Sequence, residues 1–220
     1  MFRLDGIVVT KREAPGVGRF TYPEDVSRQP LEDGFVNVTR SFVSVRYPAE
    51  VMLVASMNPC PCGFYNHPEK ECSCIPGAVQ KYLSKISGPL LDRIDLHVEV
   101  TPVPFAELNQ QGGGESSADI SKRVIRARHL QSARYKEYPG IYCNAQMSSK
   151  MLKEICVISQ VGANLLKAAM EKLNLSARAY DRILKVSRTI ADLAGSNDIK
   201  PEHLAEAIQY RSLDREGWAG

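Results

Sequence analysis

The stretch Val51–Gly63, VMLVASMNPCPCG, decides how the first half of the chain is interpreted. Its first part, Val51–Met57, is short and predominantly apolar, which predicts a strand buried on both faces of a parallel sheet. The strand runs directly into Asn58. Ligands of open α/β sheets bind beyond the carboxyl ends of the strands, so Asn58 is a candidate to orient a water or contact a phosphate. The alternative is an ordinary Asn-Pro turn.

Shorter elements surround this predicted strand. Upstream, residues 26–34 resemble the end of a helix with Gly34 as its stop, and two short runs, Val36–Arg40 and Phe42–Arg46, alternate as a β-hairpin does. Downstream, Pro76–Ile86 has helical spacing and Asp95–Val100 alternates like a second strand. The first half is therefore predicted to be an α/β structure with parallel strands.

A glycine run at residues 112–114 indicates a linker, and the chain after it has helical periodicity throughout. We therefore divide the chain into residues 1–26 of unknown role, a core at 27–104, a linker at 105–117 and an all-α domain at 118–220. The predicted helices of the last part are Ile120–Tyr135, Ser148–Val157, Val161–Leu173, Ser176–Ala194 and Pro201–Arg211.

Composition narrows the class of protein. The 220 residues are 44% hydrophobic and 24% charged, which is typical of globular proteins, and no apolar run is long enough to span a membrane. Together with the absence of a signal-like leader, this predicts a soluble, cytoplasmic protein.

The two halves of the chain differ in charge. Residues 1–120 carry a net charge of −4 and residues 121–220 one of +7. A basic second half is compatible with nucleic acid or nucleotide phosphates, or simply with a solvated helical surface.

Four cysteines, Cys60, Cys62, Cys72 and Cys74, have the spacing C-x-C-x9-C-x-C. Two thiol pairs joined by a short loop can converge on one tetrahedral cation, and four protein ligands would make a zinc ion structural. His67 offers a substitute ligand. Reduced thiols are the second interpretation, and disulfides are the least favoured because a cytoplasmic chain is kept reduced.

Two arginines are candidate phosphate ligands. Arg93 lies between a predicted helix and a predicted strand, and its guanidinium is always charged, although an ion pair with Asp92 or Asp95 is at least as good an explanation. Arg178 falls in the first turn of a helix that Ser176 is placed to cap. A cation is unfavourable there against the helix dipole, which suggests an anionic partner, or else a solvated side chain.

The sequence lacks the short motifs that mark several common nucleotide-binding and hydrolytic sites. It contains no G-x4-G-K-[ST] phosphate-binding loop, no apolar run ending in paired acids for Mg²⁺, and neither HExxH nor G-x-S-x-G. A triphosphate could not be cradled by Asn58, Arg93 and Arg178 alone, because the backbone nest and its lysine are absent.

Several segments in order make the chain similar to one family, the magnesium-chelatase-like AAA+ ATPases of the ComM/YifB type. The resemblance covers roughly residues 27–215. The segments are RQPLEDG (Arg28–Gly34), VMLVASMNPCPCG (Val51–Gly63), Cys72–Cys74, LSKISGPLLDRIDLHVEV (Leu83–Val100) and LSARAYDRILKVSRTIADLAG (Leu175–Gly195).

The resemblance implies a partial AAA+ core with a pre-sensor β-hairpin at Val36–Arg46, followed by a helical lid. It implies that Asn58 is sensor 1, Arg93 an arginine finger reaching a neighbouring subunit, and Arg178 sensor 2. It further implies ATP and Mg²⁺ as cofactors of the intact protein, self-association into a ring, most simply a hexamer, and DNA as the partner, with branch migration as the proposed role of such members.

The family's phosphate-binding loop and Mg²⁺-binding acids are expected upstream of Arg28, where this sequence has nothing similar. We therefore expect a truncated chain, a gene fragment or a degenerate member that hydrolyses negligible ATP by itself. The alternative function is a non-catalytic, zinc-bearing module that binds nucleic acid or protein. A literal metal-inserting activity on a tetrapyrrole is a weaker third interpretation.

Overall fold

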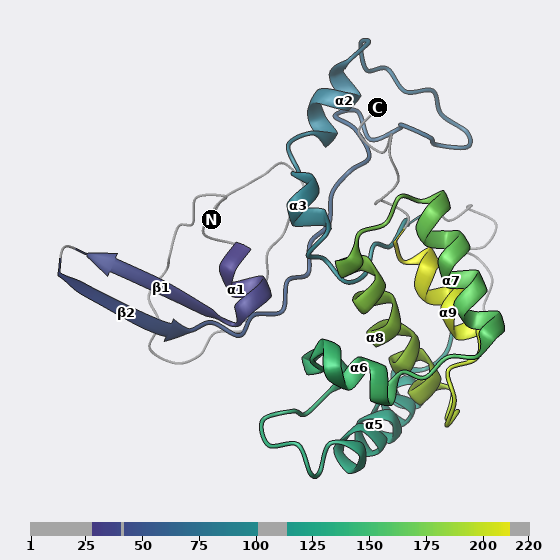
Figure 1. Ribbon diagram of the computed structural model, residues 1–220. Coiled ribbons are helices and arrows are strands. Elements are labelled where there is room, and N and C mark those ends of the chain that lie inside the picture. Colours follow the sequence, from purple (N-terminus) through teal and green to yellow (C-terminus); the bar gives the residue numbers. More distant parts are fainter. Residues whose placement is uncertain (1–27, 41, 101–113, 212–220) are drawn as a thin grey trace. The chain divides into compact units, whose positions relative to one another are not determined.

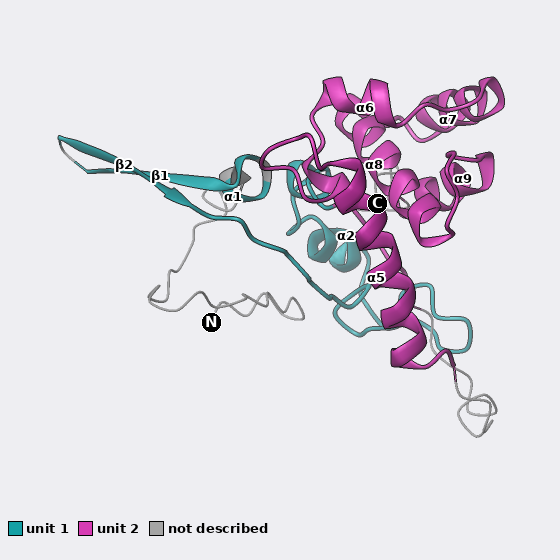
Figure 2. Ribbon diagram, turned by 90° about the horizontal axis from the view of Figure 1, so that it is seen from below, with its two compact units in different colours: residues 1–94, 219–220 teal, residues 95–218 magenta. Residues whose placement is uncertain are grey.

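The computed structural model describes residues 28–40, 42–100 and 114–211 (Figure 1). The chain divides into two compact units, residues 1–94 with 219–220 and residues 95–218 (Figure 2). The segment 1–26 and most of the expected linker, residues 105–113, lie outside the described residues. The division into core, linker and lid at the predicted boundaries stays a prediction.

The first unit begins with a short helix and a hairpin, as the sequence predicts. Helix α1 spans Arg28–Asp33 and ends at Gly34, whose φ of 71° is the left-handed conformation that glycine adopts most easily. Strands β1 (Phe35–Arg40) and β2 (Val43–Pro48) pair antiparallel (Figure 1). In this register Val38 lies opposite Val45. The Arg46 guanidinium lies 3.4 Å from the centre of the Phe35 ring, a cation–π contact that ties the strands together at their open end.

The two parallel strands expected from the sequence are not formed in the described residues, which corrects that prediction. Residues 49–58 form neither helix nor strand, and most of the segment Val51–Met57 is exposed. The segment Asp95–Val100 likewise forms no strand, although the His97 N–H donates to the Tyr210 carbonyl at 2.8 Å. A parallel strand needs neighbouring strands to take up its N–H and C=O groups, and the described residues offer none to either segment.

Two short helices complete the first unit. Helix α2 spans Ala78–Leu83, inside the predicted helix Pro76–Ile86, and α3 spans Gly88–Leu91. Among the described residues of this unit, the buried side chains are Cys60, Leu83 and Leu91. These three described side chains are a small buried apolar set, which contributes little stability by itself.

Among the described residues of the second unit, all regular secondary structure is helical apart from one isolated bridge between Ile158 and Ile199. The five predicted helices are all confirmed, each within a few residues of its predicted bounds. They are α5 (Ser117–Arg134), α6 (Ser149–Ile155), α7 (Gln160–Lys172), α8 (Ala177–Leu193) and α9 (Pro201–Gln209), with a short 3-10 helix, η1 (Asn144–Gln146).

Helix α8 is the centre of this unit, since it packs against α5, η1, α6 and α9. Its buried face alternates between apolar side chains such as Ile183, Leu184 and Ala191 and the polar residues Arg188 and Asp192. The apolar core comprises Tyr135, Met147, Met151, Leu152, Cys156, Leu166, Ile183, Leu184, Ala191, Ile199, Leu204 and Ala207.

Candidate functional site

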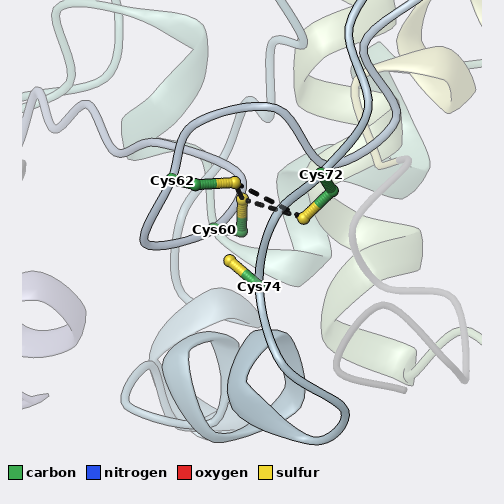
Figure 3. A group of neighbouring side chains, drawn as sticks. All are labelled: Cys60, Cys62, Cys72 and Cys74. Carbon is green, nitrogen blue, oxygen red and sulfur yellow. Dashed lines mark hydrogen bonds between the residues drawn. The ribbon is translucent and has the colours of Figure 1, made fainter.

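The four predicted cysteines come together in the first unit. Their Sγ atoms lie within 4.8 Å of one another, and Figure 3 shows them pointing into one common space. Cys60 Sγ is 3.3 Å from Cys62 Sγ and 3.7 Å from Cys72 Sγ, and Cys62 Sγ is 3.5 Å from Cys72 Sγ. The described residues therefore contain one four-thiol cluster with the size of a metal site.

Local turns fold the cysteine loop back on itself. Gly63 has a φ of 84°, and its N–H donates to the Cys60 carbonyl at 3.1 Å, closing a tight turn between the first two thiols. His67 closes a second turn, because its Nδ1 accepts from the N–H groups of Glu69 and Lys70 at 3.0 and 3.1 Å. The expected role of His67 as a substitute ligand is not met, since His67 stabilises the loop and does not belong to the cluster.

The thiols of the cluster differ in acidity. A hydrogen bond from the Phe64 backbone, helped by the neighbouring thiols against the effect of burial, lowers the pKa of Cys62 to about 5. A hydrogen bond from the Cys62 backbone favours the Cys74 thiolate, but burial and the neighbouring thiols outweigh it and raise that pKa to about 12. Four adjacent thiols cannot all lose their protons unless a cation neutralises them, which is what a divalent metal does.

The cluster is not a pair of disulfides. All six cysteines of the chain are free, and the shortest sulfur separation in the cluster, 3.3 Å, is far longer than the S–S bond of about 2.05 Å. Cys60 is fully buried and the other three are half-buried, so the set is enclosed by protein.

The residues predicted to contact a nucleotide lie in both units. Asn58 has an exposed side chain and precedes the first cysteine of the cluster by two residues. Arg93 follows α3, is half-buried, and donates from Nη1 to the Pro89 carbonyl at 2.6 Å. Its expected acidic neighbour Asp95 is the first residue of the second unit and forms an ion pair with Arg182 of that same unit.

Arg178 lies in the first turn of α8, as predicted, and its side chain is exposed. Ser176 caps the helix, because its Oγ accepts from the Ala179 N–H at 3.1 Å. Asn58 and Arg178 are thus both exposed to solvent. The roles of Asn58, Arg93 and Arg178 stay predictions.

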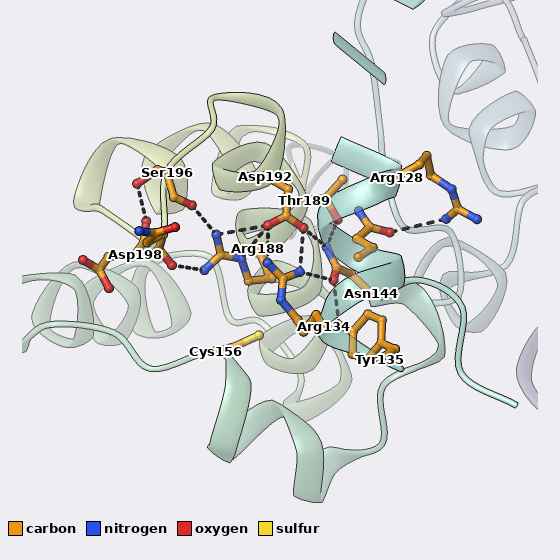
Figure 4. A network of polar contacts seen from close by, with 12 residues as sticks. Arg128, Arg134, Tyr135, Asn144, Cys156, Arg188, Thr189, Asp192, Ser196 and Asp198 are labelled. Atoms are coloured by element: carbon orange, nitrogen blue, oxygen red, sulfur yellow. Dashed lines mark hydrogen bonds and ion pairs between the residues drawn. The ribbon is translucent and has the colours of Figure 1, made fainter. Parts of the chain in front are cut away.

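A buried ionic network in the helical unit was missed by the sequence analysis (Figure 4). Asp192, fully buried, accepts from Arg134 at 2.5 and 2.7 Å, from Asn144 at 2.9 Å and from Arg188 Nε at 3.1 Å. The Tyr135 hydroxyl donates to Asn144 Oδ1 at 2.7 Å, which links the network to the core. The signal available in the sequence was the pair Arg188 and Asp192, spaced i, i+4 on the apolar face of a helix.

The network shifts the pKa values of its buried members. Burial alone would raise the pKa of Asp192, but the hydrogen bonds from Arg134 and Asn144 and the charges of Arg134 and Arg188 hold it below its ordinary value. Burial raises the pKa of Tyr135 to about 12. The network joins α5, η1 and α8 and therefore fixes the helix that carries Arg178.

Comparison with known proteins matches both halves of the chain. Residues 21–108 match the family model described as magnesium chelatase, subunit ChlI, and residues 114–211 match the model of its C-terminal region. No helix among the described residues is long and apolar enough to cross a membrane.

Curated relatives cover most of the chain. It is 42% identical over 192 residues to competence protein ComM of Haemophilus influenzae, 39% to YifB of Salmonella typhimurium and 38% to YifB of Escherichia coli. Each match covers 87% of this chain but only 36% or 37% of the relative, so the chain spans little more than a third of their length. This chain belongs to the magnesium chelatase-like family that includes ComM and YifB.

Proposed function

We propose that this chain is the part of an AAA+ ATPase that positions and responds to a bound nucleotide in a DNA-processing ring. The observation that carries the proposal is the match of both halves, in order, to the magnesium chelatase models. The exposed Asn58 and Arg178 side chains support it, because a nucleotide must reach them from solvent.

The residues present fit part of a nucleotide site. Arg178 can donate bidentate hydrogen bonds to a phosphate, and the Asn58 amide can hold a water by both donation and acceptance. Arg93 supplies a fixed positive charge, which in this proposal acts on the nucleotide of an adjacent subunit. The 220-residue sequence has no phosphate-binding loop, so we expect negligible ATP turnover from it alone. Mg²⁺ would accompany ATP and neutralise phosphate charge in the intact site.

The test separates ATP affinity from turnover in an assembly of full-length subunits that join these residues to a phosphate-binding loop. Arg93→Ala should lower kcat by about 10³-fold with ATP affinity within a few-fold, since an arginine finger acts on the transferring phosphate. Arg178→Ala should weaken ATP binding by about tenfold or more, because a charge-assisted hydrogen bond is lost. Lys167→Ala, with a lysine that is 75% exposed on α7, is the matched control and should change neither value. Normal turnover in Arg93→Ala would exclude the finger role.

DNA is proposed as the substrate because residues 121–220 carry a net charge of +7. Sequence-independent binding should weaken steeply as salt rises, since it depends on the release of counterions from phosphates. Fluorescence anisotropy with two unrelated duplexes at several salt concentrations measures this slope. Binding that is independent of salt would argue against a polyanionic partner.

The second candidate function is a non-catalytic interaction module, which the four-cysteine cluster favours. Thermal unfolding of full-length subunits with and without ATP, in the unmodified protein and in Arg178→Ala, distinguishes the two. If Arg178 binds the nucleotide, micromolar ATP should stabilise the unmodified protein more than the variant by mass action, and in an interaction module the two should not differ.

A further inference from the structure

We propose that Cys60, Cys62, Cys72 and Cys74 bind one Zn²⁺ ion, and that this ion fixes the turn at Cys60–Gly63 that directly follows Asn58. The zinc centre stands on the cluster itself, whereas the catalytic consequence for Asn58 rests on the proposed function.

The sulfur separations fit a single ion. Zn–S bonds are about 2.3 Å, so four thiolates at the corners of a tetrahedron lie about 3.8 Å apart. The Sγ separations of 3.3, 3.5 and 3.7 Å in the structure are close to this value, and Cys74 Sγ lies within 4.8 Å of the other three. A cluster of several irons would need a wider cage, so the geometry selects a mononuclear centre.

Backbone N–H groups point at the sulfurs, as they do where thiolates are held for a metal. Cys62 receives a hydrogen bond from the Phe64 backbone, Cys72 from the Cys74 backbone, and Cys74 from the Cys62 backbone. These contacts orient and stabilise the ligands from outside the first coordination sphere. Because all four ligands come from the protein, the ion has no open position for substrate and is structural.

The ion would join the two ends of a loop that has little else to hold it. Residues 60–77 contain neither helix nor strand, and residues 49–58 have no strand partner in the described part of the chain. One zinc connects Cys60, two residues after Asn58, to Cys74, four residues before α2 begins. Closing this loop restricts the unfolded chain and anchors Asn58 relative to a helix.

The first experiment measures metal in the full chain purified without a tag. We expect about one zinc per chain by mass spectrometry of metals, and Cys72→Ser to lose it. Cys143→Ser is the matched control, because Cys143 is a free thiol outside the cluster and its loss should leave the metal bound. Replacement of zinc by Co²⁺ should give the visible spectrum of a tetrahedral thiolate site. Iron in place of zinc, or no metal in the chain purified anaerobically, would overturn the proposal.

Hydrogen exchange tests the effect on Asn58. The hydrogen-bonded amides of Cys62, Gly63 and Phe64 in the turn after Asn58 should exchange at least tenfold faster in Cys72→Ser or after chelation, while helices α5 to α9 remain unchanged. The unchanged helices show that any loss is local and not a failure to fold. Equal exchange with and without zinc would refute the anchoring of this turn.

Turnover of the full-length assembly distinguishes this inference from the proposed function. Cys72→Ser should lower kcat as Asn58→Ala does, with ATP affinity retained. If zinc binds and slows exchange but neither variant changes turnover, the role of Asn58 is wrong and the zinc centre stands. If Asn58→Ala lowers kcat and Cys72→Ser does not, the link between the ion and Asn58 is wrong.

Discussion

Replacing Asp192 by Asn should strongly destabilise the helical unit. Asp192 is fully buried and balances two guanidinium groups, Arg134 at 2.5 and 2.7 Å and Arg188 at 3.1 Å. The Asn side chain has nearly the same shape but no charge, so both arginines lose their counterion. The Arg188 side chain is only 4% exposed and cannot turn to water. Breaking a buried ion pair on one side costs about 3–5 kcal/mol, a large share of the stability of a small domain.

Urea unfolding followed by circular dichroism measures this loss, because the long helices α5, α7 and α8 dominate the signal. When the same signal is followed on heating, the melting temperature of a unit of this size should fall by about 12 °C or more. Glu171→Gln is the matched control, since Glu171 is 69% exposed in an ion pair with Lys167 and should contribute less than about 1 kcal/mol. In a double-mutant cycle with Arg134→Met, the losses should be clearly less than additive. A loss below about 1 kcal/mol in Asp192→Asn would refute the role given to the network.

Three further predictions concern the same unit. Folding lowers the pKa of Asp192, so the ionised carboxylate stabilises the folded unit above the ordinary carboxyl pKa of about 3.9. This stabilisation is lost as pH falls through the lower pKa of the folded state. Urea midpoints at pH 7 and about pH 3 should show the loss, and Asp192→Asn should make the difference between the two midpoints smaller. Ser176→Ala should cost about 1 kcal/mol through the lost cap of α8, and an unchanged urea midpoint would mean that the cap is unimportant. Leu204→Ala, at a fully buried position, should cost about 2–5 kcal/mol in the same assay, and a loss under about 1 kcal/mol would contradict its place in the core.

The helical half was predictable from sequence because its signals are local. The apolar spacing of Ile183, Leu184 and Ala191 marks the buried face of α8, and Ser176 marks its start, and both follow from neighbouring residues alone. The hairpin and the stop at Gly34 were predictable for the same reason.

The apolar segment Val51–Met57 was predicted wrongly as a strand in a parallel sheet. Its composition suits such a strand, but a strand exists only when neighbours accept its hydrogen bonds, and composition does not say whether those neighbours are present. The predicted strand therefore required neighbouring strands that the described residues do not supply.

The candidate site was only partly predictable. The spacing of Cys60, Cys62, Cys72 and Cys74 was enough to predict that the thiols converge, because the loop between them is short. The ionic network was not predicted, because Arg134 and Asp192 are 58 residues apart and only the packing of α5 on α8 brings them together. The contribution of His67 to a turn, instead of to the cluster, depends on backbone geometry that spacing does not fix.

Mixing two inactive variants of full-length subunits tests the central claim most directly. That claim is that Asn58 and Arg93 of adjacent subunits serve one nucleotide. Subunits with Asn58→Ala keep the finger, and subunits with Arg93→Ala keep the water-positioning amide, so some interfaces of a mixed ring have both groups. We predict that each variant alone loses ATP turnover and that mixing restores a measurable fraction of it. Mixed rings, demonstrated by native mass spectrometry, that remain inactive at every ratio would contradict the claim.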